Sequence, residues 1–377
     1  MRPFCQIGTV PRPLAGIIGL AAFLSVSVPA VTKFGLAPAL ADVVSSRPGT
    51  NGAAASSQET VELVIGSTTP MTEAEELVNQ FKSLNPGVTV HHPKVLSSDL
   101  FENVVNPERG KIPLDVVWSS AMDLQIKLAN DGYASEYRST EAGEIPSWAQ
   151  WKDRAYGVTA EPVVMIFNKK LLRADLVPHD HADLHRLLTE NVSTFKGKIA
   201  TYDPEQSGTG LLFITQDLRV TAQTWKLIAA MGNAGVKLYA SSLPMIDRVC
   251  SGELLLAYNV MASYALERAK HDPNLGIVFP KDYTLLLSRI ALIPQSARQP
   301  VLARRFVDFL LSREGQTLLA RHSLGSVRDD MKESIPGYIE TEKALRPIAL
   351  SIELLTYLDQ SKRKRFLRDW KDALRGH

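Results

Sequence analysis

The feature that most constrains the fold is an alternation of short apolar runs with amphipathic segments. Runs of strand length are VELVIG (61–66), VTV (88–90), LDVVW (114–118), GKIATY (197–202) and ELLLAYN (253–259). The segment after the first run places Leu77, Val78, Phe81 and Leu84 on one face of a helix. Short buried strands that alternate with helices are typical of α/β domains with mostly parallel sheets. The sequence therefore predicts an α/β fold.

The first 41 residues differ in composition from the rest of the chain. Arg2 and Arg12 precede an apolar run over 14–31, and the small residue alanine occupies 39 and 41. This pattern is typical of a secretory signal peptide cleaved after Ala41, which predicts a periplasmic protein. A retained membrane anchor is the alternative, although the run is marginal for spanning a bilayer. Residues 42–60 are small and polar, which predicts a flexible lead-in.

Removing the signal peptide changes the charge balance. Residues 1–41 hold three basic and no acidic side chains, so Lys+Arg falls from 42 to 39 against 40 Asp+Glu. No basic excess remains to favour nucleic acid as a partner. Cys250 is then the single cysteine, which excludes an intramolecular disulfide.

The sequence does not favour an enzyme. It contains no G-x-S-x-G elbow, no H-E-x-x-H motif and no P-loop. Cys250 lies in a helical pattern with apolar neighbours, and no base is placed to activate it. We therefore predict no catalytic residues, no metal site and no cofactor.

Small polar residues follow four of the predicted strands. In open α/β sheets the ligand lies beyond the carboxyl ends of the strands, where N–H groups at helix starts attract anions. Helix capping alone would also explain each of these residues. Together they predict one polar cleft, and the candidate ligand-binding residues are Ser67, Thr68, Thr69, Ser119, Ser120, Ser207, Gly208, Thr209, Gly210 and Asn259.

The order of several segments resembles a known family. DVVWSSAMDLQIKLANDGY (115–133), YGVTAEPVVMIFNKKLL (156–172), DPEQSGTG (203–210) and ARRFVDFLLSREGQ (303–316) are similar to bacterial periplasmic solute-binding proteins of ABC transporters, in particular the ferric-iron-transport-like group. The resemblance implies a type II fold of two lobes, with lobe one over 60–160 plus 280–330 and lobe two over 161–279. It implies crossings near 159–164 and 278–283, a cleft that closes on the ligand, and an ABC permease as partner.

One departure from the family concerns the ligand. Iron-binding members carry two adjacent tyrosines where this chain has Ala262 and Ser263. Tyr258 and Tyr264 flank that place but are too far apart to form such a pair. We therefore expect a small anionic solute that bears phosphate or carboxylate. Ferric iron is the alternative ligand, with a bound anion and Tyr258 or Tyr264 as its possible contacts. Glu161, near the first crossing, is a further candidate for ligand contact.

The C-terminal extension, 331–377, is a second departure. LRPIALSIELLTYLDQSKRKRFLRDW (345–370) resembles a subset of these receptors associated with sensor kinases, so a periplasmic ligand sensor is another alternative function. Residues 361–375 form a basic amphipathic pattern. Such a helix either docks on a lobe or contacts a partner or a membrane surface.

A histidine-rich motif, HDHADLH (179–185), has some features of a metal site. His181 and His185 have the i, i+4 spacing of two ligands on one helix face. The polar surroundings favour solvent-exposed histidines instead.

Overall fold

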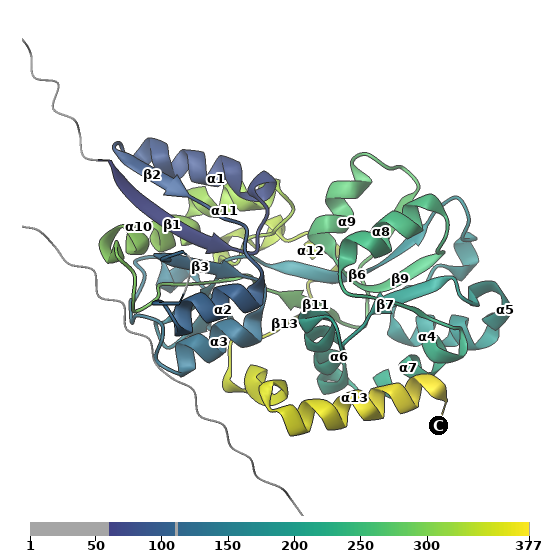
Figure 1. Cartoon of the computed structure of the whole chain (residues 1–377). Helices are drawn as coiled ribbons and strands as arrows, with labels where there is room; N and C mark the ends of the chain where they lie inside the picture. The colour runs from purple at the N-terminus through teal and green to yellow at the C-terminus, as the bar shows by residue number, and fades with distance from the viewer. Residues whose placement is uncertain (1–59, 110–111, 377) are drawn as a thin grey trace, which may run out of the picture. The chain divides into compact units, whose positions relative to one another are not determined.

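The computed structural model describes residues 60–109 and 112–376 (Figure 1). The predicted signal peptide and all but the last residue of the predicted lead-in lie outside the described residues. Two sheets, each flanked by helices, make up the described part, which confirms the predicted α/β fold. We call each sheet with its helices a lobe. Within the described ranges, no helix is both long and apolar enough to cross a membrane.

The sheet of the first lobe has the strand order β2-β1-β3-β12-β5-β4. β1 lies parallel to β2 and β3, whereas β12 pairs antiparallel with β3 and β5, and β4 with β5. All of β3 and most of β1 are buried, as expected for interior strands covered by helices. The strands are β1 (Val61–Ser67), β2 (Val88–His91), β3 (Val116–Ser119), β4 (Gln150–Trp151), β5 (Ala155–Gly157) and β12 (Ile290–Leu292).

The helices of the first lobe pack their apolar faces on this sheet. Phe81, on the predicted apolar face of α1, meets Phe306 of α10 edge to face, with ring centroids 5.0 Å apart. The helices are α1 (Met71–Leu84), α2 (Ser97–Val105), α3 (Met122–Asn130), α10 (Pro300–Leu311) and α11 (Arg313–Arg321).

The sheet of the second lobe has the order β13-β11-β6-β9-β7-β8, and β10 also pairs with β6. Its strands are β6 (Glu161–Asn168), β7 (Ile199–Tyr202), β8 (Lys237–Tyr239), β9 (Leu256–Met261), β10 (Leu275–Val278), β11 (Thr284–Leu287) and β13 (Leu345–Pro347). Its helices are α4 (His181–Glu190), α5 (Val192–Phe195), α6 (Gly208–Val220), α7 (Thr224–Asn233), α8 (Ser242–Ser251) and α9 (Ala262–Ala269).

The crossings between lobes differ in part from the prediction. The first lies between β5 and β6, close to the predicted position. The second lies at 288–289 and not near 278–283, because the apolar run 284–287 forms β11 and pairs antiparallel with β6. The start of the range 280–330 therefore belongs to the second lobe. The predicted helical extension also contains a strand, β13, which lies parallel to β11.

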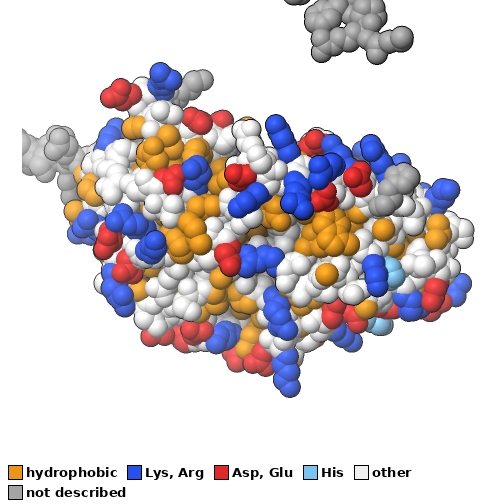
Figure 2. Space-filling view, turned by 90° about the horizontal axis from the view of Figure 1, so that it is seen from below, with side chains coloured by type: hydrophobic (Ala, Val, Ile, Leu, Met, Phe, Trp, Pro, Cys, Tyr) orange, Lys and Arg blue, Asp and Glu red, His pale blue; other side chains and the backbone are white. Residues whose placement is uncertain are grey.

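The C-terminal segment contacts both lobes. A 3₁₀ helix, η5 (Ile352–Leu358), packs against α3, and α13 (Gln360–Arg375) packs along α7. Phe366 is buried between Trp225 of α7 and Tyr357 of η5. A side chain at Gly232 would collide with the carbonyl oxygen of Leu374, so glycine permits the close approach of the helices. The face that carries α13 bears many Lys and Arg side chains (Figure 2).

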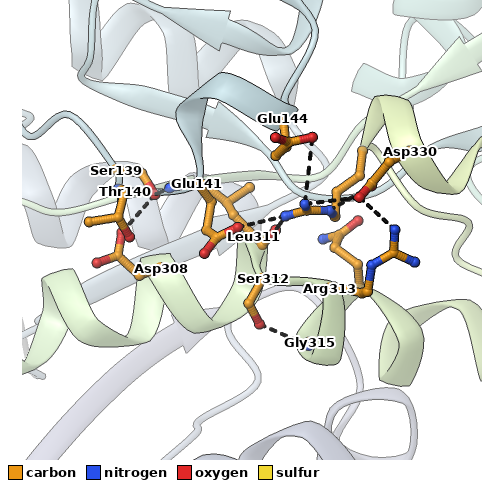
Figure 3. Close-up of polar contacts among 12 residues, drawn as sticks. Ser139, Thr140, Glu141, Glu144, Asp308, Leu311, Ser312, Arg313, Gly315 and Asp330 are labelled. Atoms are coloured by element: carbon orange, nitrogen blue, oxygen red, sulfur yellow. Dashed lines mark hydrogen bonds and ion pairs between the residues drawn. The ribbon is translucent and has the colours of Figure 1, made fainter.

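Arg328 helps to fix the segment between α11 and β13 to the first lobe. The segment contains two short helices, η4 (Asp329–Ser334) and α12 (Tyr338–Thr341). Glu141, Glu144 and Asp330 converge on the Arg328 guanidinium (Figure 3). The side chain of Arg328 is 6% exposed, and it also donates to the carbonyl oxygen of Leu311.

Candidate functional site

The polar ends of β1 and β3 lie next to each other in the first lobe. The Ser120 N–H donates to Thr68 Oγ1 at 3.2 Å, and the Thr68 N–H donates to the carbonyl oxygen of Trp118. Ser67 Oγ accepts from the Thr69 N–H, and Ser119 Oγ accepts from the Ala121 N–H. Ser67, Thr69 and Ser119 are buried, whereas Thr68 and Ser120 are partly exposed. The structure thus brings five of the predicted residues together at one sheet edge, and two of them are open to solvent.

The SGTG turn lies at the start of α6 in the second lobe. Ser207 Oγ accepts from the Gly210 N–H at 3.1 Å, so the serine caps the helix. A side chain at Gly210 would collide with Tyr202 on β7, which accounts for the second glycine. Gly208 is exposed and Thr209 partly exposed, so the first turn of α6 stays accessible.

The starts of α3 and α6 line one small cavity, although the helices belong to different lobes. The cavity measures about 180 Å³ and is lined by Asp123 of α3, Gly208 of α6, and Thr356 and Tyr357 of η5. Burial raises the pKa of Asp123, although N–H donors and Arg363 partly offset that effect. The C-terminal segment therefore forms one wall of the space between these two helix starts.

α1 and α9, which follow two of the strand ends, start without a side-chain cap. α1 follows Pro70 and α9 follows Met261, and neither residue carries a capping oxygen. α3 follows Ala121, but the Asp123 carboxylate in its first turn accepts from the Leu124 N–H at 2.9 Å. A helix start has a partial positive charge and N–H groups that need an acceptor. The starts of α1 and α9 are therefore suited to hold a ligand oxyanion.

A buried charged cluster joins the two lobes at the second crossing. Arg289 donates to both oxygens of Glu161, from Nε at 2.8 Å and from Nη2 at 3.0 Å. Its Nη1 donates to Thr69 Oγ1 at 3.0 Å and to Glu73 Oε2 at 2.7 Å. Ser263, at the start of α9, donates to Glu161 Oε2. We call these five residues the hinge cluster.

The electrostatics of the hinge cluster follow from its two carboxylates and one guanidinium. Burial opposes the charged form of Arg289, but Glu161 and Glu73 more than offset it and raise its pKa. Burial raises the pKa of Glu73, and Arg289 offsets part of that effect. The Tyr264 ring lies 5.9 Å from the guanidinium carbon, and burial raises the pKa of its phenol. Glu161 and Tyr264, both predicted ligand contacts, thus flank a fixed cation.

Asn259 and Tyr258 point into the interior of the second lobe. Asn259 has φ +61, and its Nδ2 donates to Asp217 Oδ2 at 2.7 Å. The Tyr258 hydroxyl donates to the same oxygen at 2.8 Å, and Tyr283 donates to Oδ1 at 3.1 Å. We call these four residues the Asp217 cluster. Burial raises the pKa of Asp217, although His181 and the three donors oppose the shift.

The Asp217 cluster separates Tyr258 and Asn259 from the other predicted residues. Tyr258 is 1% exposed, and its buried phenol has a pKa well above the ordinary value. Both side chains hold an internal carboxylate in this conformation. Apolar neighbours of Asp217 in LLFITQDLRV are the one sequence signal that could have identified it.

The histidine motif also differs from the expectation. His181 is buried, stacks on Tyr283 with ring centroids 3.9 Å apart, and places Nδ1 2.9 Å from Asp282. It is therefore not a solvent-exposed histidine. Over the described ranges, no three His, Cys, Asp or Glu side chains lie close enough to hold a metal ion.

Comparison with known proteins places the chain in a family. The model of the family described as bacterial extracellular solute-binding protein matches residues 63–323. The substrate-binding protein of an ABC transporter from Agrobacterium tumefaciens is 37% identical, with a TM-score of 0.76 over 85% of this chain and 96% of that one. No protein with a curated functional description matches the sequence.

More distant structures share the fold. Iron-bound HitA from Pseudomonas aeruginosa is 21% identical over 83% of this chain and 99% of that one, with a TM-score of 0.61. AfuA from Actinobacillus pleuropneumoniae, with fructose-6-phosphate bound, is 20% identical over 83% of this chain and 98% of that one, with a TM-score of 0.62. The predicted type II two-lobed fold is thereby confirmed, and the protein belongs to the bacterial extracellular solute-binding protein family.

Proposed function

We propose that the protein is the periplasmic receptor of an ABC importer and binds a small anionic solute between its lobes. The observation that carries the proposal is the pair of uncapped helix starts, α1 and α9, at the ends of β1 and β9. N–H groups there suit phosphate or carboxylate oxygens. The Agrobacterium protein, which serves an ABC transporter, supports the transport role.

The predicted residues take roles according to their exposure. Thr68 and Ser120, partly exposed and joined by a hydrogen bond, donate hydroxyls from the first lobe. Gly208 and Thr209 present the first turn of α6 from the second lobe. Ser67, Thr69, Ser119, Ser207 and Gly210 position these groups through the contacts described above. Asn259 instead holds Asp217 of α6.

A thermal-shift screen tests the proposal. The probes are inorganic phosphate, sugar phosphates, small carboxylates and ferric citrate. A ligand at a hundred times its Kd stabilises the folded state by about 2.7 kcal/mol, which gives a clear rise in Tm. Ser120→Ala should weaken that rise, whereas Ser193→Ala, an exposed serine on α5, should leave it unchanged. A rise with a bare ferric salt and with none of the anions would contradict the proposal.

Ferric iron is a second candidate ligand because HitA carries it on the same fold. In this chain Tyr264 would be the phenolate donor, since Tyr258 is buried against Asp217. A phenolate–iron charge-transfer band in the visible spectrum, lost in Tyr264→Phe, would establish iron binding. A colourless protein after incubation with ferric citrate would exclude this candidate.

A sensor role remains the third candidate, and the C-terminal segment allows a test of it. Reversing the exposed charges Lys362, Lys364 and Arg365 leaves the buried face of α13 intact. If this surface contacts only a sensor kinase, these changes should leave uptake of the solute intact. Loss of uptake with retained ligand binding would instead indicate contact with the permease.

A further inference from the structure

The second lobe contains a larger cavity, away from the helix starts described above. It measures about 450 Å³ and lies between α4, α7, the end of α6 and residues 282–283. α6 has 13 residues and spans about 20 Å, and this cavity lies at Val220, the opposite end from Ser207. It is therefore a separate space within one lobe.

Two basic side chains of this cavity have no polar partner among the described residues. His185 and Lys226 line it, and neither side chain makes an ion pair or hydrogen bond to another described residue. The carboxylate that lines it, Asp282, is already engaged. It accepts from His181 Nδ1 at 2.9 Å and from the backbone N–H of His181 and Tyr283.

The walls of the cavity are apolar and its floor is held rigidly. Leu227 and Val220 contribute aliphatic surface, and Tyr283 contributes its ring. Tyr283 stacks on His181 and donates to the buried Asp217, and these contacts hold its ring in place at the base of the cavity. A volume of this size lies within the range of small-molecule sites in proteins.

We infer that this cavity is a second ligand site, for a small organic acid. Its carboxylate pairs with Lys226 and His185, and its apolar body lies against Leu227 and Tyr283. The site stands on its own lobe and does not depend on which solute binds between the lobes. A neutral analogue of the same shape lacks the charge that Lys226 attracts, and a cationic one is repelled by it.

The test compares three probes of one shape, 3-phenylpropanoate, 3-phenylpropanamide and 3-phenylpropylamine, by ligand-observed NMR and calorimetry on the full chain. The acid should bind at least several-fold more tightly than the amide, and the amine should bind most weakly. The C2–H signal of His185, assigned by its loss in His185→Ala, should shift with the acid.

Variants locate the probe. Lys226→Ala should weaken binding of the acid about threefold, and Lys226→Glu should weaken it further by repulsion. Lys196→Glu, an exposed lysine of the same lobe that does not line the cavity, should leave the affinity unchanged. Equal binding of acid and amide would overturn the inference. So would an affinity that Lys226→Glu does not change, because the probe would then bind elsewhere.

Discussion

The hinge cluster and the Asp217 cluster each bury a carboxylate completely, but they compensate it differently. Glu161 receives a guanidinium with two parallel hydrogen bonds. Asp217 accepts from one amide and two phenols, and it forms no ion pair with another described residue. In the hinge cluster a full positive charge joins residues of two lobes. In the Asp217 cluster neutral donors hold together residues of one lobe.

This difference predicts different responses to mutation and to pH. A buried carboxylate that loses its paired cation keeps a large desolvation cost, because nothing else neutralises it. A carboxylate held by neutral donors can instead take up a proton, and burial already raises the pKa of Asp217. The hinge cluster should therefore depend on the presence of Arg289, and the Asp217 cluster on protonation.

The largest effect is expected from Arg289→Met. The change leaves the buried Glu161 and the partly buried Glu73 without a cation, so the free energy of unfolding should fall by about 3–5 kcal/mol. Urea denaturation measures the loss. Arg321→Met is the matched control, because Arg321 pairs with Glu76 at the surface and should lose about 1 kcal/mol or less. Equal losses in the two variants would refute the role of the hinge cluster.

A smaller loss is expected from Asp217→Asn. The amide keeps the shape of the side chain but presents an N–H₂ group toward donors of Tyr258, Asn259 and Tyr283. One mismatched buried hydrogen bond costs about 1–3 kcal/mol. Asp175→Asn, in an exposed pair with Arg173, provides the control in the same denaturation experiment. A loss larger than that of Arg289→Met would reverse the comparison.

The pH dependence of stability separates the clusters further. The folded-state pKa of Asp217 lies above its ordinary value of 3.8, so the folded protein retains a proton that the unfolded chain has released. Its contribution to stability is complete below about pH 3.8 and is lost as the pH rises through the folded-state pKa. The wild type should therefore lose stability relative to Asp217→Asn as the pH rises through this window. The opposite slope would show that Asp217 is ionised at lower pH in the folded state.

The sequence anticipated the first cluster better than the second. Glu161 could be placed near a crossing because the family resemblance locates the crossing, and strand periodicity placed the end of β1 in the predicted polar cleft. The pairing of Arg289 with Glu161 could not be predicted, because the two residues lie 128 positions apart and no local sequence pattern indicates their contact. Asp217 lies inside a helix among apolar residues, where its three donors become visible only once β9 and residue 283 are packed around it.

The second crossing shows the same limit. TLLL (284–287) is an apolar run too short to be assigned to either sheet from periodicity alone. Its pairing with β6 assigns it to the sheet of the second lobe, and that pairing depends on a tertiary contact. By contrast, helix capping by the SGTG turn could be predicted from the sequence, because the hydrogen bond between Gly210 and Ser207 is local.

The smallest effect is expected from Glu73→Gln. Arg289 keeps both bonds to Glu161 in this variant, and the amide oxygen still accepts from Nη1. Burial already raises the pKa of Glu73, so a neutral side chain also removes part of a desolvation cost. Stability should change by about 1 kcal/mol or less in urea denaturation.

Glu161→Gln should cost several times more, because it removes the carboxylate that holds Arg289 in a bidentate pair. Equal costs in the two variants would mean that total negative charge around Arg289, and not the geometry of its pair with Glu161, joins the lobes.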